Sequence, residues 1–196
     1  MSVLLHWITW QLGLAAAEVW TTEAERACLA RHAAGKRRLV EVGVWHGGTT
    51  THLRRAMSAQ ATLFAVDPFP RGRLGISLPR VVARREVARV PNGRVIWLRM
   101  SGEAAAKLEM MREQPPPDFV FVDNAQTFET LRIEWEAWAP LVAPGGVICL
   151  HDTRPWPEGS TVQTSVEYAQ AVVLQDSRFT TDEEVDSLIV LRRRPG

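Results

Sequence analysis

The chain contains little cysteine, and its charges nearly cancel. Its 196 residues include two cysteines, Cys28 and Cys149, which lie far apart and lack the spacing of metal ligands. We therefore expect reduced core residues in a cytoplasmic protein rather than a disulfide framework. A formal net charge of +1 gives no general case for binding nucleic acid or a membrane surface.

A membrane-length apolar run is also missing. Residues 3–17 are largely apolar, but His6, Thr9 and Gln11 interrupt them, and no positive charge precedes them as in a signal peptide. A cleaved signal stays open as the alternative.

We expect an apolar helix over residues 1–20, with Leu4, Leu5, Ile8 and Leu12 on one face. This face would pack on a single domain of residues 21–196 or on a second copy of the chain. The second case would give a homodimer. Thr22 followed by Glu25 is a capping box, which predicts that a helix begins there.

The dinucleotide fingerprint Gly-x-Gly-x-x-Gly is absent. Residues 39–51 read instead Leu-Val-Glu-Val-Gly-Val-Trp-His-Gly-Gly-Thr-Thr-Thr. This pattern predicts a strand, a tight turn and a helix, the unit that binds a nucleotide-like cofactor at the carboxyl edge of a parallel sheet. Gly43 would let the backbone turn sharply and approach a ligand closely. Gly47 and Gly48 would leave the start of the helix, with its free N–H groups, uncovered.

The spacing Glu41-x-Gly43-x-x-x-Gly47 resembles motif I of the class I S-adenosylmethionine-dependent methyltransferases. The resemblance implies that this turn wraps the methionine part of the cofactor, with Trp45 and Thr49 among the contacts. Glu41 would lie beneath the turn, ordering it or reaching the cofactor ammonium through water. The alternative is an ordinary buried turn between a strand and a helix.

A second buried strand, residues 61–66, ends in Asp67-Pro68. A carboxylate offers two acceptor oxygens, so Asp67 suits the two hydroxyls of a ribose, although an Asp before Pro is also common in turns. Arg71 and Arg73 follow directly and are candidates to contact an acidic substrate group such as a phosphate or carboxylate; the alternative is a solvated surface. The arginines at 80–89 have helical spacing, which is typical of a solvated face.

Three further strands are predicted before the end of the central region. Residues 93–98 precede Ser101, a helix N-cap that the resemblance also makes an adenine contact. Residues 118–122 end at Asp123, and residues 147–150 end in His151-Asp152-Thr153. A helix and then a Pro-Gly-Gly turn connect residues 118–122 to residues 147–150. Residues 154–160 are a candidate substrate lid.

Residues 118–153 resemble a methyltransferase branch that includes sugar and antibiotic O-methyltransferases and cephalosporin-hydroxylase-like proteins. Two closing strands, at 179–185 and 187–192, fit the same layout. The resemblance implies an α/β, Rossmann-like, doubly wound sheet of about seven strands, with helices on both faces. The sheet would be mostly parallel, with one antiparallel strand in the last pair.

Such relatives carry Asp-Gly-Asp-His after the fourth strand, whereas this chain reads Asp-Asn-Ala-Gln from Asp123 to Gln126. The alanine and the glutamine can neither ligate a metal nor take a proton at neutral pH. The remaining catalytic candidates are His151 and Asp123, the latter also a cofactor contact. Asp123 and Asp152 are the metal candidates, with Asn124 or Thr153 as a neighbouring donor, because oxygen ligands suit Mg²⁺.

The favoured function is S-adenosylmethionine-dependent O-methylation of a small hydroxylated metabolite, such as a sugar or a natural-product intermediate. Neither nucleic acid nor membrane is expected as a partner. One alternative is a protein of this fold that binds cofactor without turnover, as a partner subunit. Another is an NAD-dependent oxidoreductase, which the glycine spacing and the lack of a Tyr-x-x-x-Lys pair at Tyr168 disfavour.

Overall fold

The computed structural model describes residues 3–72, 75–112, 115–155 and 163–196. Arg73 and most of the candidate lid therefore lie outside the described residues. The described residues form one seven-stranded sheet in the order β3-β2-β1-β4-β5-β7-β6. The strands are β1 (Arg38–Val42), β2 (Thr62–Val66), β3 (Arg94–Leu98), β4 (Phe119–Val122), β5 (Val147–Leu150), β6 (Phe179–Val185) and β7 (Leu188–Arg193).

The first five strands are parallel, and β7 runs antiparallel to its neighbours β5 and β6. The predicted fold class is thus confirmed, including the antiparallel strand in the last pair. The carboxyl ends of β1, β2, β4 and β5 meet at one edge of the sheet. The two candidate halves of the site, the glycine turn and the strand-end acids, lie on that edge.

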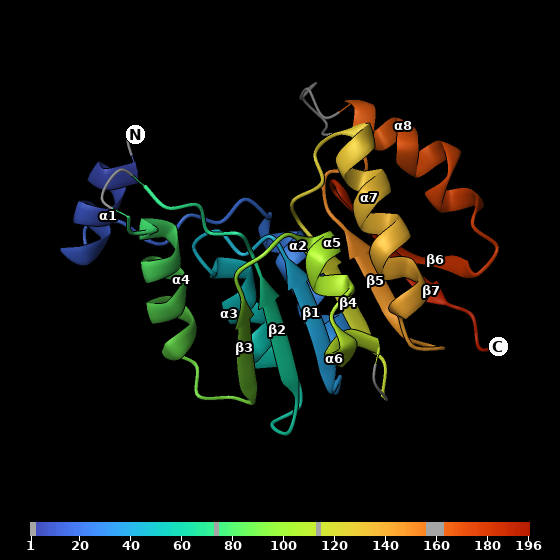
Figure 1. Cartoon of the computed structure of the whole chain (residues 1–196), viewed down its shortest axis with the longest axis horizontal. Helices are drawn as coiled ribbons and strands as arrows, with labels where there is room; N and C mark the ends of the chain where they lie inside the picture. Colours follow the sequence, from blue (N-terminus) through green and yellow to red (C-terminus); the bar gives the residue numbers. More distant parts are fainter. Residues whose placement is uncertain (1–2, 73–74, 113–114, 156–162) are drawn as a thin grey trace.

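Helices cover both faces of the sheet (Figure 1). They are α1 (Val3–Gln11), α2 (Glu23–Ala33), α3 (Gly48–Ala56), α4 (Leu78–Ala88), α5 (Gly102–Ala106), α6 (Glu109–Arg112), α7 (Phe128–Trp138) and α8 (Gln163–Ala171), with 3-10 turns at Ala139–Leu141 and Val173–Gln175. The single helix expected after Ser101 is split into α5 and α6. None of the described helices is long and apolar enough to cross a membrane.

Alternating side chains along the strands build two separate core layers. On β1, Val40 and Val42 pack with α5, α7 and α8, where Trp135 and Trp138 fill the space. Leu39 points the other way, into the layer formed with α2 and α3. Because both faces are buried, the strands need an unbroken apolar sequence, and this is why the short apolar runs were recognisable.

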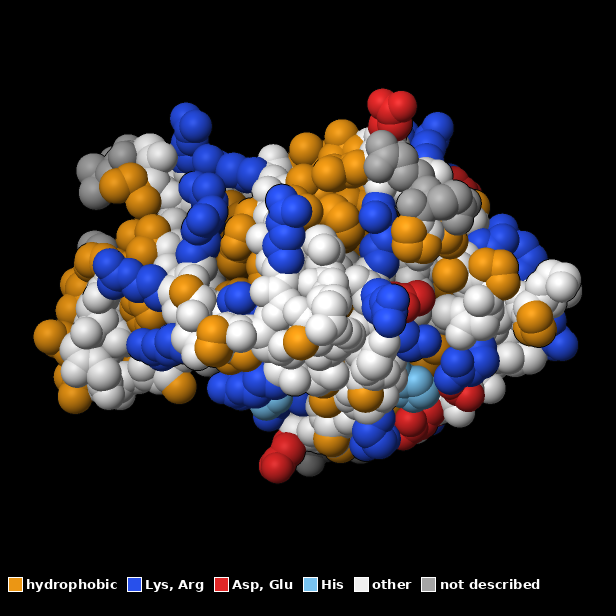
Figure 2. Space-filling model, turned by 90° about the horizontal axis from the view of Figure 1, so that it is seen from below, with side chains coloured by type: hydrophobic (Ala, Val, Ile, Leu, Met, Phe, Trp, Pro, Cys, Tyr) orange, Lys and Arg blue, Asp and Glu red, His pale blue; other side chains and the backbone are white. Residues whose placement is uncertain are grey.

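The N-terminal helix is shorter than expected and packs by a different face. It ends at Gln11 rather than near residue 20. Trp10 is buried against α4, where its indole N–H donates to Glu86 at 2.6 Å. The predicted packing face is exposed instead: Ile8 is 40% and Leu12 67% accessible. Figure 2 shows hydrophobic side chains gathered at the end of the molecule where Figure 1 has α1.

Candidate active site

The turn after β1 needs glycine because β4 approaches it. Gly43 has φ +93°, and a Cβ there would lie 2.8 Å from the carbonyl carbon and oxygen of Asp123. Gly43 was predicted to let a ligand approach closely, but on this side of the turn the group that approaches it is the backbone of Asp123. Gly47 is left-handed as well, and a side chain on it would press on Ala83 of α4. Both glycines hold the turn down onto the sheet edge.

Asp67 ties the end of β2 to this turn. Its Oδ2 accepts hydrogen bonds from the backbone N–H groups of Val44 at 3.0 Å and Trp45 at 3.1 Å. Its Oδ1 accepts from the N–H of Phe69 at 2.7 Å. The carboxylate remains partly accessible. The turn after β1 and the end of β2, which were predicted to bind the same cofactor, are thus in contact.

Three non-glycine residues at this edge have left-handed backbones. Trp45, Phe69 and Asp152 follow β1, β2 and β5, with φ of +50°, +44° and +56°. Bulky residues adopt this conformation at a cost of about 1–3 kcal/mol each, and such strain concentrates at functional sites. Sequence reasoning did not identify it, because no residue type announces it. Its clustering at one edge marks the same site independently.

Glu41 is fully buried beneath the turn. Neither carboxylate oxygen has a well-aligned hydrogen bond with any residue that the structure describes, and the neighbouring Thr50 hydroxyl is likewise unpaired there. Burial raises the pKa of Glu41 well above its usual value, the Thr50 hydroxyl lowers it, and the charges of Asp123 and Asp67 raise it further. These surroundings therefore disfavour the charged form of the Glu41 carboxyl group.

His151 is buried in a chain of acids. Its Nε2 lies 3.2 Å from Oε2 of Glu25, and its Nδ1 lies 2.7 Å from Oδ1 of Asp123 and 3.6 Å from Oδ2 of Asp152. Glu25 also accepts hydrogen bonds from the backbone N–H and the hydroxyl of Ser187. The sequence had shown Glu25 only as part of the Thr22 capping box, which the structure confirms.

These acids keep His151 positively charged. Burial alone lowers the pKa of His151, but the hydrogen bonds to Asp123 and Glu25 and the charges of Asp123 and Asp152 raise it to about 10. An imidazolium has no lone pair with which to take a proton at neutral pH. The expectation that His151 is the general base therefore does not fit this geometry.

The predicted Mg²⁺ site does not fit these residues either. The Nδ1 of His151 lies beside both carboxylates, Asp123 and Asp152, and already supplies the positive charge there. The Asn124 amide is turned to Glu134 at 2.8 Å, and the Thr153 hydroxyl donates to a backbone carbonyl. Among the described residues, three potential metal ligands converge only at Cys28, His32 and Glu183, away from this edge.

The segment after α1 covers the start of α3. Thr49, a predicted cofactor contact, pairs its hydroxyl with that of Thr21 at 3.1 Å. The side chain of Val19 occupies the space above Gly48, which was expected to be uncovered. Glu18 accepts a hydrogen bond from the indole N–H of Trp45 at 3.1 Å. Thr49 therefore faces the N-terminal segment in this structure.

Ser101 caps α5, as its sequence context predicted. Its hydroxyl oxygen accepts from the N–H of Ala104 at 3.3 Å, and the side chain is exposed. Behind it, Glu134 is buried, and burial raises its pKa although Asn124 and Trp138 hydrogen-bond it. Sequence reasoning missed Glu134 because a charged residue on an amphipathic helix reads as solvated. Ser101 remains available to a ligand at the end of β3.

Comparisons with known proteins agree with this architecture. An O-methyltransferase from Bacillus cereus, solved with S-adenosylhomocysteine, is 20% identical over 98% of this chain and 89% of its own, with a TM-score of 0.64. The O-methyltransferase TomG of Streptomyces achromogenes is 18% identical over 100% and 91%, with a TM-score of 0.63. A Corynebacterium glutamicum protein is 15% identical over 96% and 87%, with a TM-score of 0.69.

At these identities the structural likeness shows the fold. No curated protein matches the sequence. The match that carries the family is the one to the model described as a methyltransferase domain. It covers residues 40–153, from within β1 to the residues that follow β5, and so includes the strand-end residues described above. Since these residues make up more than half of the chain, the protein belongs to the methyltransferase domain family.

Proposed function

We propose that this protein transfers a methyl group from S-adenosylmethionine to a hydroxyl of a small acceptor, such as a sugar or a natural-product intermediate. Membership of the methyltransferase domain family supports the reaction class. Two proteins of similar fold are O-methyltransferases; one was solved with S-adenosylhomocysteine and the other, involved in tomaymycin synthesis, with S-adenosylmethionine. Nothing in the comparisons favours the oxidoreductase alternative.

The observation that carries the proposal is the contact between Asp67 and the turn after β1. It places a partly accessible carboxylate, which would bind the ribose, beside the backbone turn that would bind the methionine part of the same cofactor. Glu41 also interacts electrostatically with Asp67 and Asp123, whose charges raise its pKa. A ligand that carries a sulfonium and an ammonium group complements this cluster of acids, and Glu41 has unused acceptor atoms for it.

In this proposal Asp123 takes the proton of the acceptor hydroxyl. Its side chain is 18% accessible, and it follows β4 directly. Burial raises the pKa of Asp123, and the hydrogen bond from His151 offsets part of that rise. A carboxylate whose pKa lies nearer to neutrality is a better proton acceptor than an ordinary one. His151 acts as a positioning residue, because its Nδ1 lies 2.7 Å from Oδ1 of Asp123 and holds that carboxylate in place.

When bound, S-adenosylmethionine supplies an activated methyl group on a sulfonium. The chain's own task is then to align the acceptor oxygen with that carbon and to remove its proton. Asp67 and the Gly43 turn hold the donor side, and Asp123 serves the acceptor side. No step requires a metal, because the donor set around Asp123 does not suit one.

The binding half is tested by calorimetry with S-adenosylmethionine, S-adenosylhomocysteine and NAD⁺. We expect the two sulfur compounds to bind and NAD⁺ not to bind. Asp67→Ala should weaken binding about tenfold or more, because it removes both ribose acceptors and the two N–H contacts of the turn. Unchanged affinity in this variant, or a preference for NAD⁺, would contradict the proposal.

The catalytic half is tested by methyl release over a panel of sugars, phenols and amines. Asp123→Asn should lower turnover by a factor of about 10²–10⁴ while S-adenosylhomocysteine still binds. Asp118→Asn is the matched control, because Asp118 precedes the same strand that Asp123 follows. Cofactor binding without methyl release from any acceptor would favour the partner-subunit alternative instead.

A further inference from the structure

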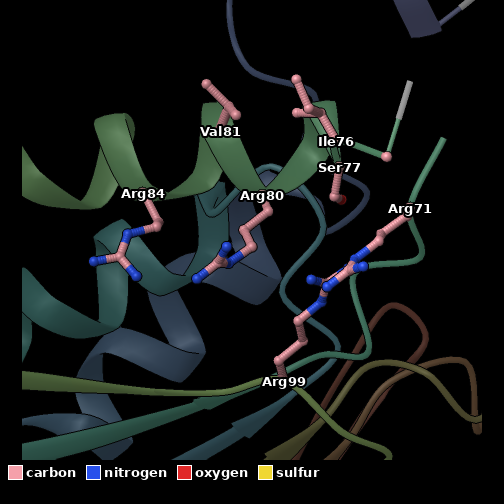
Figure 3. Close-up of a pocket in the computed structure, with 8 residues that line it drawn as sticks. Arg71, Ile76, Ser77, Arg80, Val81, Arg84 and Arg99 are labelled. Atoms are coloured by element: carbon pink, nitrogen blue, oxygen red, sulfur yellow. The ribbon is translucent and has the colours of Figure 1, made fainter. Parts of the chain in front are cut away.

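A pocket of about 300 Å³ lies between the start of α4 and the end of β3 (Figure 3). Four arginines line it: Arg71 from the loop after β2, Arg80 and Arg84 from α4, and Arg99 from the end of β3. Figure 3 shows Arg71 and Arg99 reaching toward one another below Ser77, with Arg80 and Arg84 extending from α4 on the same side. No acidic residue is among its described lining residues.

Two of these guanidinium groups are fixed, and two are unengaged. Arg99 donates to the backbone carbonyls of Pro68 at 3.2 Å and Phe69 at 2.6 Å, and Arg84 lies 5.5 Å from the ring centre of Trp97. Arg71 and Arg80 have no hydrogen-bond or ion-pair partner among the residues that the structure describes. Like charges held this close repel one another. A cluster of them without counter-charge is an arrangement that an anion would stabilise.

Ser77 adds an observation of a different kind. It is only 6% accessible, its hydroxyl has no hydrogen-bond partner among the described residues, and it lines the pocket. It occupies the N-cap position of α4 but makes no capping hydrogen bond. A buried hydroxyl without a hydrogen bond destabilises the folded protein, and such a group in a native protein calls for a partner. An oxygen of a bound anion would provide one at the positive end of an 11-residue helix.

We propose that this pocket binds the phosphate or diphosphate group of a small molecule. Guanidinium groups pair with phosphate oxygens through two parallel N–H bonds, and several of them can share one diphosphate. The volume accommodates such a group together with part of the molecule that carries it. A single carboxylate would satisfy fewer of the donors. The proposal does not rest on methyl transfer, because no atom of the Gly43 turn lines the pocket.

The pocket nevertheless shares a wall with the candidate cofactor site. Arg99 holds the carbonyls of the two residues that follow Asp67, and Asp67 itself accepts from the N–H of Phe69. A ligand that draws Arg99 toward the pocket therefore acts on the segment that carries Asp67. Helical spacing predicted that most of the arginines at 80–89 form a solvated face, but Arg80 and Arg84 line this pocket together with Arg71.

The test is isothermal titration of the whole chain with inorganic pyrophosphate, inorganic phosphate and citrate. We expect pyrophosphate to bind more tightly than phosphate or citrate. The double variant Arg71→Gln/Arg80→Gln should lose about tenfold or more in pyrophosphate affinity, and Ser77→Ala should lose severalfold. Arg94→Gln is the matched control, because Arg94 begins the strand after which Arg99 lies. It should bind pyrophosphate as the unaltered chain does.

Circular dichroism and S-adenosylhomocysteine titration of each variant separate the possible failures. A folded double variant that keeps its pyrophosphate affinity would overturn the proposal, as would a folded unaltered chain that binds no pyrophosphate. A single-stranded oligonucleotide that binds and that pyrophosphate cannot displace would also overturn it, in favour of a nucleic-acid surface. Loss of S-adenosylhomocysteine binding with pyrophosphate binding intact would count against the methyltransferase proposal alone.

Discussion

Replacing His151 by asparagine tests the buried chain that links it to Glu25 and Asp123. The substitution removes a cation that lies within 3.2 Å of one buried carboxylate and 2.7 Å of another. Breaking a buried ion pair on one side costs about 3–5 kcal/mol, because the remaining charge stays without compensation. The shift of the His151 pKa from 6.5 to about 10 corresponds to a similar free energy, about 4–5 kcal/mol.

The sign of the pH dependence follows from the direction of that shift. A histidine whose pKa is higher in the folded protein than in the unfolded chain stabilises fully below about pH 6.5. That contribution declines as the pH rises and is lost above about pH 10, where the folded imidazole also loses its proton. The difference in unfolding free energy between the unaltered chain and His151→Asn should therefore be largest near pH 6 and shrink toward pH 10.

Urea unfolding followed by tryptophan fluorescence, from pH 6 to pH 10.5, measures this difference. His52→Asn is the control, since burial lowers the pKa of His52, and its contribution changes only below about pH 6.5. If the difference in unfolding free energy between the unaltered chain and His151→Asn stays constant from pH 6 to pH 10.5, His151 is not positively charged in the folded protein. An imidazole titration of His151 near pH 6.5 in an NMR experiment would likewise contradict the raised pKa.

Three other predictions follow from the same structure. Gly43→Ala should cost about 2–4 kcal/mol in thermal unfolding, because it adds both backbone strain and a collision with the end of β4. Gly145→Ala, equally left-handed but with nothing within 4 Å, should cost only about 1 kcal/mol, and equal losses would contradict the steric argument. Glu41→Gln should stabilise the protein at pH 8 by about 1–3 kcal/mol. The carboxyl pKa of Glu41 is higher in the folded protein than in the unfolded chain, so ionisation of the unfolded chain above about pH 4.5 favours unfolding, and glutamine removes this penalty. The same variant should bind S-adenosylmethionine more weakly, and a loss of stability would show that Glu41 is ionised in the free protein. We propose that the chain forms a homodimer through the exposed face of α1. Light scattering should then find a dimer for the unaltered chain and a monomer for the double variant Ile8→Lys/Leu12→Lys. A monomeric unaltered chain would exclude this interface.

The fold was predictable because burial on both faces leaves a strong mark in sequence. Short apolar runs without polar alternation correspond closely to β1, β2, β4 and β5. The capping pattern of Thr22 and Glu25 correctly gave the start of α2. The N-terminal helix was predicted too long, since it ends at Gln11. Its face with Ile8 and Leu12 does not pack on the domain. The helix is held instead by Trp10, through one hydrogen bond to Glu86 and burial on α4.

The site was predictable in its positions but less so in its contacts. Strand-end acids and glycines stand out because a parallel sheet brings its carboxyl ends together. Which group faces which depends on residues far away in sequence, such as Glu25, which lies 126 positions before His151. The strain at Trp45 and Phe69 was invisible for the same reason. It comes from the way that Asp67 gathers N–H groups from both segments.

The acids at this edge therefore have three different physical states, although they look alike in sequence. Glu41 is buried without a well-aligned hydrogen bond among the described residues, and its raised pKa disfavours the charged form until a cation arrives. Asp67 is satisfied by backbone N–H groups and shapes the turn. Asp123 is paired on one side with a charged histidine and is accessible on the other. Of the three, only Asp123 combines a raised pKa with access to an acceptor, which is why proton removal belongs to it rather than to His151.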